Sequence, residues 1–279
     1  MGRFTASDGA RIAYSDEGAG RPLVLLHGLM AHSGFFERQR ALADGFRLIR
    51  IDLRGHGESP SDRGIPTIDV LARDVAELAD HLGLEGAIGI GWSLGASVLW
   101  KLLEGPASTR FAGMVVVDMT PRVMNGDDWA LGLPPETCAA RSRAIAEDFA
   151  TFATAAGAAI FAPDGEATPS PLAEWAGAEF ARNDSAAIGA IWASLVEQDF
   201  RPTLGRIRQP TLVVHGAHSH LYDAATAHHL VAALPNASDA CFEHSGHAPH
   251  LDEPDRFNRI LRDFAASLPP VRQPQTQTA

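Results

Sequence analysis

A serine between two glycines is the residue in this chain best suited to chemistry. The segment Gly91–Gly95 (GWSLG) has the pattern G-x-S-x-G and lies between an apolar run and a helical pattern. A sharp strand-to-helix turn would present the serine Oγ at the end of the strand, and the glycines are needed because backbone atoms crowd there. The Leu94 amide, at the helix start, can then stabilise an oxyanion. The pattern predicts Ser93 as a nucleophile; the alternative is a glycine-rich turn with a capping serine.

A second oxyanion donor is expected from an earlier loop. His27-Gly28-Leu29 closes the apolar run Pro22–His27, which reads as a strand. The backbone N–H of Leu29 has the position that an oxyanion donor needs. We expect the His27 side chain to brace the loop rather than to take part in chemistry.

A histidine follows the last predicted strand. Ser245–His250 (SGHAPH) comes after Asp239–Glu243, so its first histidine can reach the same end of the sheet as Ser93. There it would accept the serine proton as a general base and return it to the leaving group. The chain has 12 histidines, so a surface histidine is the alternative. The order of serine and then histidine, both after strands, favours His247.

Strand-like runs alternate with helical patterns through most of the chain. The helical pattern is clearest in Thr67–Leu82, where apolar residues recur at helical spacing. The strands are apolar on both faces, which is typical of a parallel sheet covered by helices. The predicted strands are Arg11–Tyr14, Pro22–His27, Phe46–Asp52, Ala87–Gly91, Gly113–Asp118, Thr211–His215 and Asp239–Glu243, and the other predicted helices are Leu94–Leu103, Ala224–Leu234 and Asp255–Leu268.

A long helical insertion interrupts this alternation. Residues 119–203 are rich in alanine and lack strand-like runs, and Pro135–Ala150 and Ala173–Phe200 read as helices. We therefore predict a core of residues 1–118 and 204–268 and a helical cap of residues 119–203. Residues 269–279 (PPVRQPQTQTA) have almost no apolar content and are expected to be a disordered tail.

Composition and charge exclude several classes of protein. The chain has 279 residues, 46% of them hydrophobic, and a formal net charge of −11, so a nucleic-acid binder, which needs a basic face, is disfavoured. No apolar run reaches the roughly 18 residues of a membrane span, and no signal peptide is evident. Cys138 and Cys241 are too few for a disulfide framework. We expect a cytoplasmic protein, and nothing in the sequence specifies an oligomeric state.

Five motifs together resemble the α/β-hydrolase family over about residues 3–268. They are LLHGL at Leu25–Leu29, DLRGHGES at Asp52–Ser59, GWSLGA at Gly91–Ala96, QPTLVVHG at Gln209–Gly216 and SGHAPHLDEP at Ser245–Pro254. The GWSLG form and the short loop after His27 resemble the BioH-like carboxylesterases. The resemblance implies a mostly parallel eight-stranded sheet with a cap inserted after strand six. It also implies Ser93 as nucleophile, His247 as base and Leu29 and Leu94 as oxyanion donors, with Asp52–Ser59 as a structural loop.

The expected acid is missing from its usual place. The family usually carries the acid a few residues after the glycine of strand seven, and here that position is Ser219. We predict instead that Asp118 is the acid, because it follows an apolar strand at the edge where α/β proteins bind ligands. The alternatives are that Asp118 caps the first turn of the cap, or that Asp223 is the acid. Asp223 lies seven residues beyond Gly216 and is expected to cap the helix that follows it.

These residues predict a cofactor-free serine hydrolase acting on a small-molecule carboxylic ester or lactone. The alternatives are a C–C bond hydrolase or perhydrolase with the same triad, or a non-catalytic ligand-binding protein on a hydrolase scaffold. The candidate lining residues suggest a fairly apolar substrate and are Met30, Trp92, Met119, Trp129 and Leu131.

Three further predictions concern ligands. The runs His218-x-His220 and His228-His229 invite a metal interpretation, but no Cys or carboxylate cluster accompanies them, so we expect no metal. The acidic surface argues against an acidic carrier-protein substrate. Arg122, Arg141 and Arg143 could still form a local basic patch in the cap.

Overall fold

An eight-stranded, mostly parallel sheet forms the centre of the computed structural model, which describes residues 1–163 and 170–270. The strand order is β1-β2-β4-β3-β5-β6-β7-β8; β1 and β2 are antiparallel to their neighbours and the rest are parallel. The predicted fold class is confirmed. The strands are β1 (Gly2–Thr5), β2 (Arg11–Gly18), β3 (Arg21–Leu26), β4 (Phe46–Ile51), β5 (Ala87–Trp92), β6 (Phe111–Val117), β7 (Thr211–Gly216) and β8 (Ala237–Phe242).

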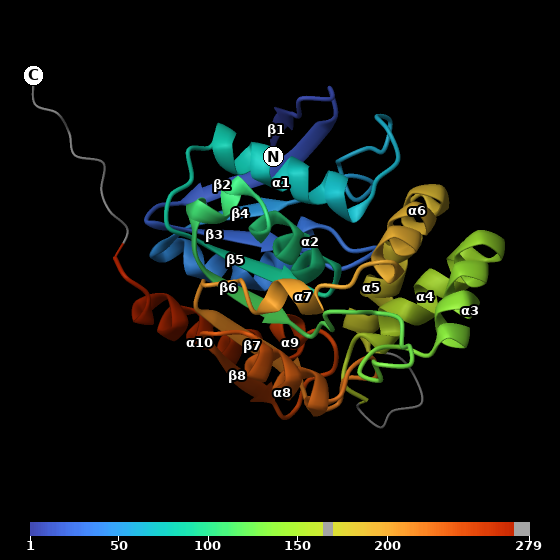
Figure 1. Cartoon of the computed structure of the whole chain (residues 1–279). Coiled ribbons are helices and arrows are strands. Elements are labelled where there is room, and N and C mark those ends of the chain that lie inside the picture. Colours follow the sequence, from blue (N-terminus) through green and yellow to red (C-terminus); the bar gives the residue numbers. More distant parts are fainter. Residues whose placement is uncertain (164–169, 271–279) are drawn as a thin grey trace, which may run out of the picture.

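Helices surround the sheet and gather at one side of it (Figure 1). Two are 3₁₀ segments, η1 (Ser33–Asp44) and η2 (Pro106–Arg110). The α-helices are α1 (Ile68–His81), α2 (Leu94–Leu103), α3 (Pro135–Glu147), α4 (Phe149–Ala159), α5 (Pro171–Ala181), α6 (Ser185–Val196), α7 (Arg201–Leu204), α8 (Ala224–Ala233), α9 (Pro249–Asp252) and α10 (Pro254–Ser267).

Two glycines on neighbouring strands show that helices cover both faces. Gly89 of β5 and Gly113 of β6 point to opposite faces, because Gly113 is paired with Ile88, the residue before Gly89. A side chain at Gly89 would collide with Leu99 of α2, whereas one at Gly113 would collide with Leu268, directly after α10, and press against Phe264 of α10. Helices α2 and α10 therefore pack on opposite faces. This explains why β5 is buried along its whole length and carries no polar side chain.

The segment predicted as a cap holds α3 to α6, which lie together beside the sheet in Figure 1. The two long helices expected there are each interrupted by an aspartate. Asp148 begins α4 by accepting a hydrogen bond from Thr151 N, and Asp184 begins α6 by accepting one from Ala187 N. A carboxylate at the N-cap favours the start of a helix, so a new helix begins after each of these aspartates. That residues 119–203 form a separate cap domain stays a prediction.

The strand β1 was not predicted, because four residues with two exposed polar side chains carry little pattern. Of the tail expected to be disordered, residues 271–279 lie outside the described residues. Within the described part, no helix is both long enough and apolar enough to cross a bilayer.

Candidate active site

Ser93 lies in the sharp turn between β5 and α2. Its backbone has φ 52° and ψ −118°, a strained conformation for a residue with a side chain. The neighbouring glycines allow the turn, because a Cβ at Gly95 would collide with the Leu26 carbonyl and one at Gly91 with the Ala96 amide. The predicted strand-to-helix turn is therefore present, and its strain is held in place by backbone packing.

The strained residues of the structure meet at one edge of the sheet. In the described residues, the non-glycine positions with positive φ are Met30 (67°), Ser93 (52°) and Asp118 (47°). They follow β3, β5 and β6, three adjacent parallel strands, whose carboxyl ends share this edge. Strain of this kind persists where the surroundings enforce it, commonly at functional sites.

His247 and Asp118 form a buried pair. His247 Nδ1 lies 2.6 Å from Asp118 Oδ2, and both side chains are almost fully buried. An Nδ1–H that donates to the carboxylate leaves Nε2 as the nitrogen available to a substrate or to Ser93. The Trp92 indole N–H donates to the His247 carbonyl over 2.8 Å and so ties this loop to the nucleophile turn.

Ser219 completes the surroundings of this carboxylate. Its hydroxyl donates to the same Asp118 Oδ2 over 2.6 Å. The other oxygen, Oδ1, is buried and has no hydrogen-bond partner among the described residues. Asp223 instead accepts hydrogen bonds from Ala225 N and Thr226 N at the start of α8, which confirms its predicted role as a helix cap. The geometry therefore favours Asp118 over Asp223 as the partner of His247.

Two backbone amides are available beside Ser93. Neither Leu29 N nor Leu94 N donates a hydrogen bond to another described residue. The Leu29 loop is held from two sides: Asn183 Nδ2 donates to the Met30 carbonyl over 2.6 Å, and His27 bridges Gly28 O and Leu53 N. The predicted bracing role of the His27 side chain is confirmed.

An apolar cavity of about 330 Å³ contains both Ser93 and His247. The structure records no hydrogen bond between Ser93 Oγ and the imidazole, and such contacts are often long before substrate binds. The other lining residues come mainly from the loop after β3, from α4 and α6, and from the loop after β7. They are Gly28, Leu29, Met30, Trp92, Met119, Arg141, Phe152, Ala155, Ala156, Ala159, Ile160, Phe180, Trp192, Leu195, His220, Leu221 and Tyr222.

Three of the five predicted lining residues line the cavity and two lie outside it. Met30, Trp92 and Met119 line the cavity. Trp129 does not; its indole N–H donates to the Arg122 carbonyl in the loop after β6. Leu131 lines a separate depression of about 210 Å³ beside residues 219–223. Both come from a loop whose path an amino-acid pattern does not specify.

The cavity also contains two residues that sequence reasoning assigned elsewhere. Arg141 was considered only as part of a basic patch, and His220 only as half of a metal-binding pattern. The place of Arg141 on the helix after the β6 loop is the signal that could predict it as a lining residue, because that region covers the sheet edge. Within the described residues, no group of three or more His, Cys, Asp or Glu is placed to hold a metal ion.

Residues 23–260 match the family model described as the alpha/beta hydrolase family. The chain belongs to this family. It is 30% identical over 254 residues to a pimeloyl-acyl-carrier-protein methyl ester esterase of Nitrosomonas europaea, with 89% of this chain and 97% of the relative covered. It is 31% identical to a non-heme chloroperoxidase of Streptomyces lividans, with 96% of this chain and the whole relative covered.

A solved esterase of Exiguobacterium antarcticum has a closely similar structure. Its TM-score is 0.88 at 26% identity, with 96% of this α/β hydrolase and the whole of that chain covered. The predicted resemblance to the BioH-like esterases is confirmed by the family match and these relatives. The expected enzyme class, a carboxylic-ester hydrolase, is confirmed, because similar proteins such as these two are named as esterases.

Proposed function

We propose that this α/β hydrolase cleaves a carboxylic ester or lactone of a fairly apolar small molecule through an acyl-enzyme. The observation that carries the proposal is the 2.6 Å contact between His247 and Asp118 beside the cavity that contains Ser93. A serine, a histidine and a carboxylate in this relation can generate a nucleophile at neutral pH. The mainly apolar cavity wall supports the substrate class.

In this proposal Ser93 Oγ attacks the carbonyl carbon while His247 Nε2 takes its proton. The resulting oxyanion accepts hydrogen bonds from the Leu29 and Leu94 amides. The tetrahedral intermediate collapses, the carbon–oxygen bond to the alcohol breaks, and the imidazolium protonates the departing alcohol. Water, deprotonated by the same imidazole, then attacks the acyl-serine and releases the carboxylic acid.

Asp118 acts through the histidine. Its carboxylate holds the imidazole with Nδ1 protonated and stabilises the imidazolium that forms during each proton transfer. Ser219 donates to the same oxygen and orients the carboxylate. Ser219 is a positioning residue in this scheme, because it contacts neither the substrate nor the reacting atoms.

A fluorophosphonate probe and p-nitrophenyl esters of varied length test the proposal. Wild-type protein is expected to be labelled and to release nitrophenol, and Ser93→Ala to lose both. Ser97→Ala is the matched control, because Ser97 is a buried serine one turn further along α2 whose hydroxyl has no partner among the described residues. Folded wild-type protein that neither reacts with the probe nor turns over any ester would overturn the proposal and favour a binding protein.

A perhydrolase is a second candidate, favoured by the chloroperoxidase name of one relative. Hydrogen peroxide would replace water in attacking the acyl-serine, so the product would be a peracid and the serine would be regenerated. Adding peroxide during ester turnover and measuring bromide oxidation by the released peracid tests this candidate. Unchanged yields of carboxylic acid, with no oxidised bromide, would exclude it.

A further inference from the structure

Arg141 brings a positive charge to an otherwise apolar cavity. It lies in the middle of α3, is partly buried, and is among the residues that line the cavity containing Ser93. The described lining residues include no aspartate or glutamate, and no other lysine or arginine. Its guanidinium has no ion-pair partner among the described residues, so its charge is balanced by nothing in the cavity wall.

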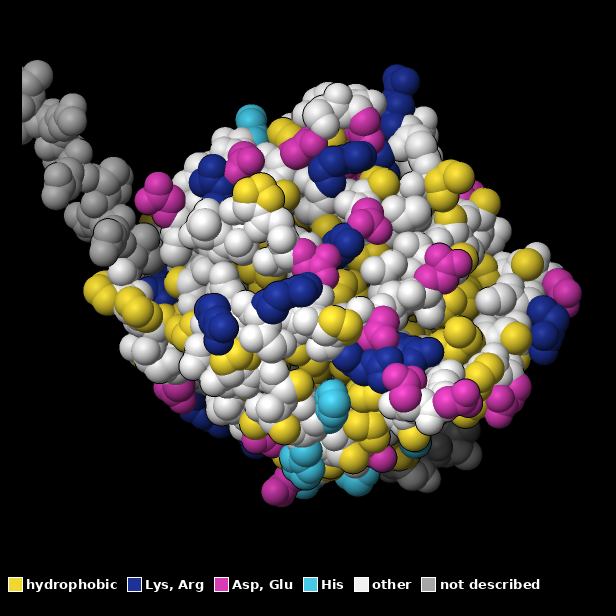
Figure 2. Space-filling view, in the orientation of Figure 1, with side chains coloured by type: hydrophobic (Ala, Val, Ile, Leu, Met, Phe, Trp, Pro, Cys, Tyr) yellow, Lys and Arg dark blue, Asp and Glu magenta, His cyan; other side chains and the backbone are white. Residues whose placement is uncertain are grey.

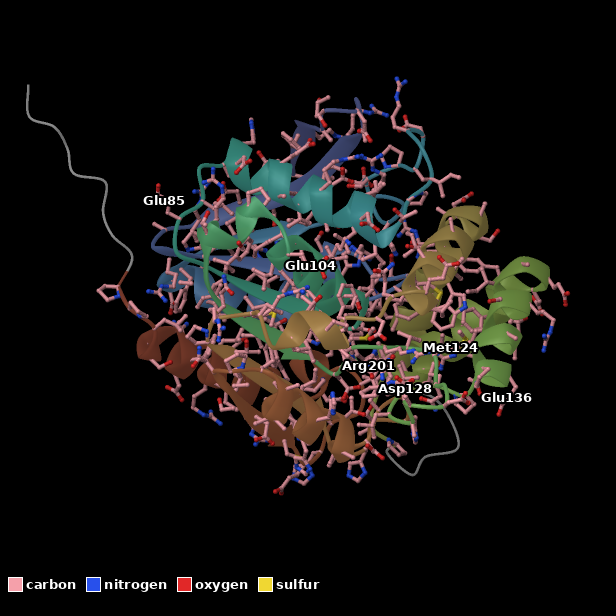
Figure 3. The ribbon with its side chains drawn as sticks, in the orientation of Figure 1. Glu85, Glu104, Met124, Asp128, Glu136 and Arg201 are labelled. Atoms are coloured by element: carbon pink, nitrogen blue, oxygen red, sulfur yellow. The ribbon has the colours of Figure 1, made fainter. Side chains whose placement is uncertain are left out.

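Two arginines near the loop after β6, Arg201 and Arg122, are paired with a carboxylate. Arg201 and Arg122 both contact the Asp128 carboxylate, at 3.0 Å and 2.9 Å. Figure 3 shows Arg201 and Asp128 close together, and Figure 2 shows acidic side chains beside the dark-blue patch in this part of the surface. Arg141 differs from these two arginines because it lines the cavity and has no carboxylate partner among the described residues.

The Arg141 side chain is held in place by an aromatic ring. Its guanidinium carbon lies 5.7 Å from the centroid of the Trp192 ring, within the range of a cation–π interaction. Trp192 is in turn oriented from the same helix, because its indole N–H donates to Ser142 Oγ over 3.1 Å. This arrangement places the charge before a ligand arrives and reduces the entropy lost on binding.

Tyr222 is close enough to feel the Arg141 charge and also lies near the His247 ring. Burial raises the pKa of Tyr222, and the positive charge of Arg141 opposes this rise. The Tyr222 ring is 6.2 Å from the His247 ring, measured between centroids. The guanidinium and the proposed base thus lie in one cavity, with apolar side chains such as Phe152 and Leu195 also in its wall.

We propose that Arg141 binds a carboxylate carried by the substrate, at the end of the molecule remote from the scissile carbonyl. This inference rests on the proposed function and sharpens its substrate class to esters or lactones with an apolar body and one anionic end. A guanidinium in a low-dielectric cavity gains from a bidentate carboxylate, which matches its planar donors. One guanidinium balances one carboxylate, whereas a phosphate dianion would require a second cation.

Two matched esters test the proposal. 4-Nitrophenyl hydrogen glutarate carries a free carboxylate, and 4-nitrophenyl methyl glutarate is the same molecule with that carboxylate methylated. We expect wild-type kcat/KM to be at least about tenfold higher for the first, mainly through a lower KM, because a charge-assisted hydrogen bond in a desolvated cavity stabilises the bound ester. In Arg141→Gln the ratio should fall to about one.

Arg143→Gln is the matched control, because Arg143 is an exposed arginine two residues further along the same helix. It should keep the wild-type ratio. A wild-type ratio near one, or an Arg141→Gln variant that loses activity equally on both esters, would overturn the carboxylate site while leaving the ester hydrolase intact. Equal loss of the ratio in Arg143→Gln would assign it to general surface charge and also overturn the site.

Binding to Ser93→Ala separates this inference from the proposed function, because it needs no turnover. Glutarate should bind, measured by calorimetry, and dimethyl glutarate should bind at least about tenfold more weakly, with the difference lost in Ser93→Ala/Arg141→Gln. If wild-type protein cleaves no ester, this result would still support the anion site. Inorganic phosphate that binds more tightly than glutarate would overturn the choice of carboxylate.

Discussion

The turn that carries Ser93 is formed by five consecutive residues, whereas the surroundings of Asp118 are formed by segments far apart in the chain. The turn is set by Gly91–Gly95, whose glycines fit against crowded backbone. The Asp118 carboxylate is contacted from residues 101 and 129 positions away, Ser219 and His247. A local turn can be recognised from a five-residue pattern, but a cluster assembled from three strand ends cannot.

The same comparison separates a sterically constrained part of the site from a part that other side chains could also build. The nucleophile turn tolerates few side chains because backbone atoms occupy the space. Parallel strand ends meet at one sheet edge, so we expect that a carboxylate could reach the histidine from β6 or from the loop after β7. Here β6 supplies Asp118, and the loop after β7 supplies Ser219, a hydrogen-bond donor to it.

The largest expected effect is that of Asp118→Asn. The amide would favour the wrong imidazole tautomer, so kcat for an activated ester should fall by about 10³- to 10⁴-fold with the fold intact. Steady-state kinetics and thermal unfolding measure both quantities. Asp223→Asn, which changes a helix cap, should keep kcat within about twofold; the reverse result would assign the acid to the loop after β7.

The nucleophile turn is tested by Gly95→Ala. The added methyl group would collide with the Leu26 carbonyl, a backbone atom that cannot move without shifting β3. We expect the free energy of unfolding to fall by about 3 kcal/mol, measured by urea titration. Gly205→Ala is the control, because nothing lies within 4 Å of a Cβ built there. Equal stability of the two variants would mean that the β3 backbone does not constrain the turn.

A double substitution tests whether the strand ends are interchangeable. Asp118→Asn combined with Ser219→Asp places a carboxylate on the β7 side of the same cluster. We expect kcat to recover by about 10- to 100-fold over Asp118→Asn alone, since Ser219 Oγ already lies 2.6 Å from the Asp118 oxygen that contacts the imidazole. Ser219→Asp alone should be slower than wild type, because two carboxylates would repel each other. No recovery in the double variant would show that a carboxylate at position 219 cannot act as the partner of His247.

The smallest expected effect concerns a neighbour of the proposed base. Burial lowers the pKa of His250 to about 3, because its ring is enclosed by Phe36, Trp92 and Phe257. Between pH 6.5 and 3 the unfolded chain binds a proton at this residue and the folded chain does not, so stability is lost as the pH falls through this range. The loss is about 2 kcal/mol at pH 5.

His250→Phe should remove that loss while keeping the aromatic packing and most ester turnover. Urea unfolding at pH 7 and pH 5 measures the difference. His218→Gln, a change at an exposed histidine, serves as the control. An unchanged pH dependence in His250→Phe would mean that another buried histidine, such as His56 with a pKa lowered to about 4 by burial, dominates acid sensitivity.

Much of the fold was predictable because its strongest signals are local. The apolar strands, the spacing of Thr67–Leu82 and the five-residue pattern of the nucleophile turn can each be recognised within a short stretch of sequence. Helix α2 begins and ends where the sequence predicts, at Leu94 and Leu103. The helices of residues 119–203 were less well predicted, because their breaks depend on single capping aspartates in alanine-rich sequence.

The candidate site also has one part that the sequence predicts and one part that it does not. The sequence alone determined the types of Ser93, His247 and Asp118 and their places at strand ends, because a parallel sheet brings such ends to one edge. Only the tertiary structure decided that Ser219 donates to Asp118, that Trp129 and Leu131 lie outside the cavity, and that Arg141 lies within it. These outcomes depend on how loops and helices far apart in the chain pack over that edge, which residue patterns do not encode.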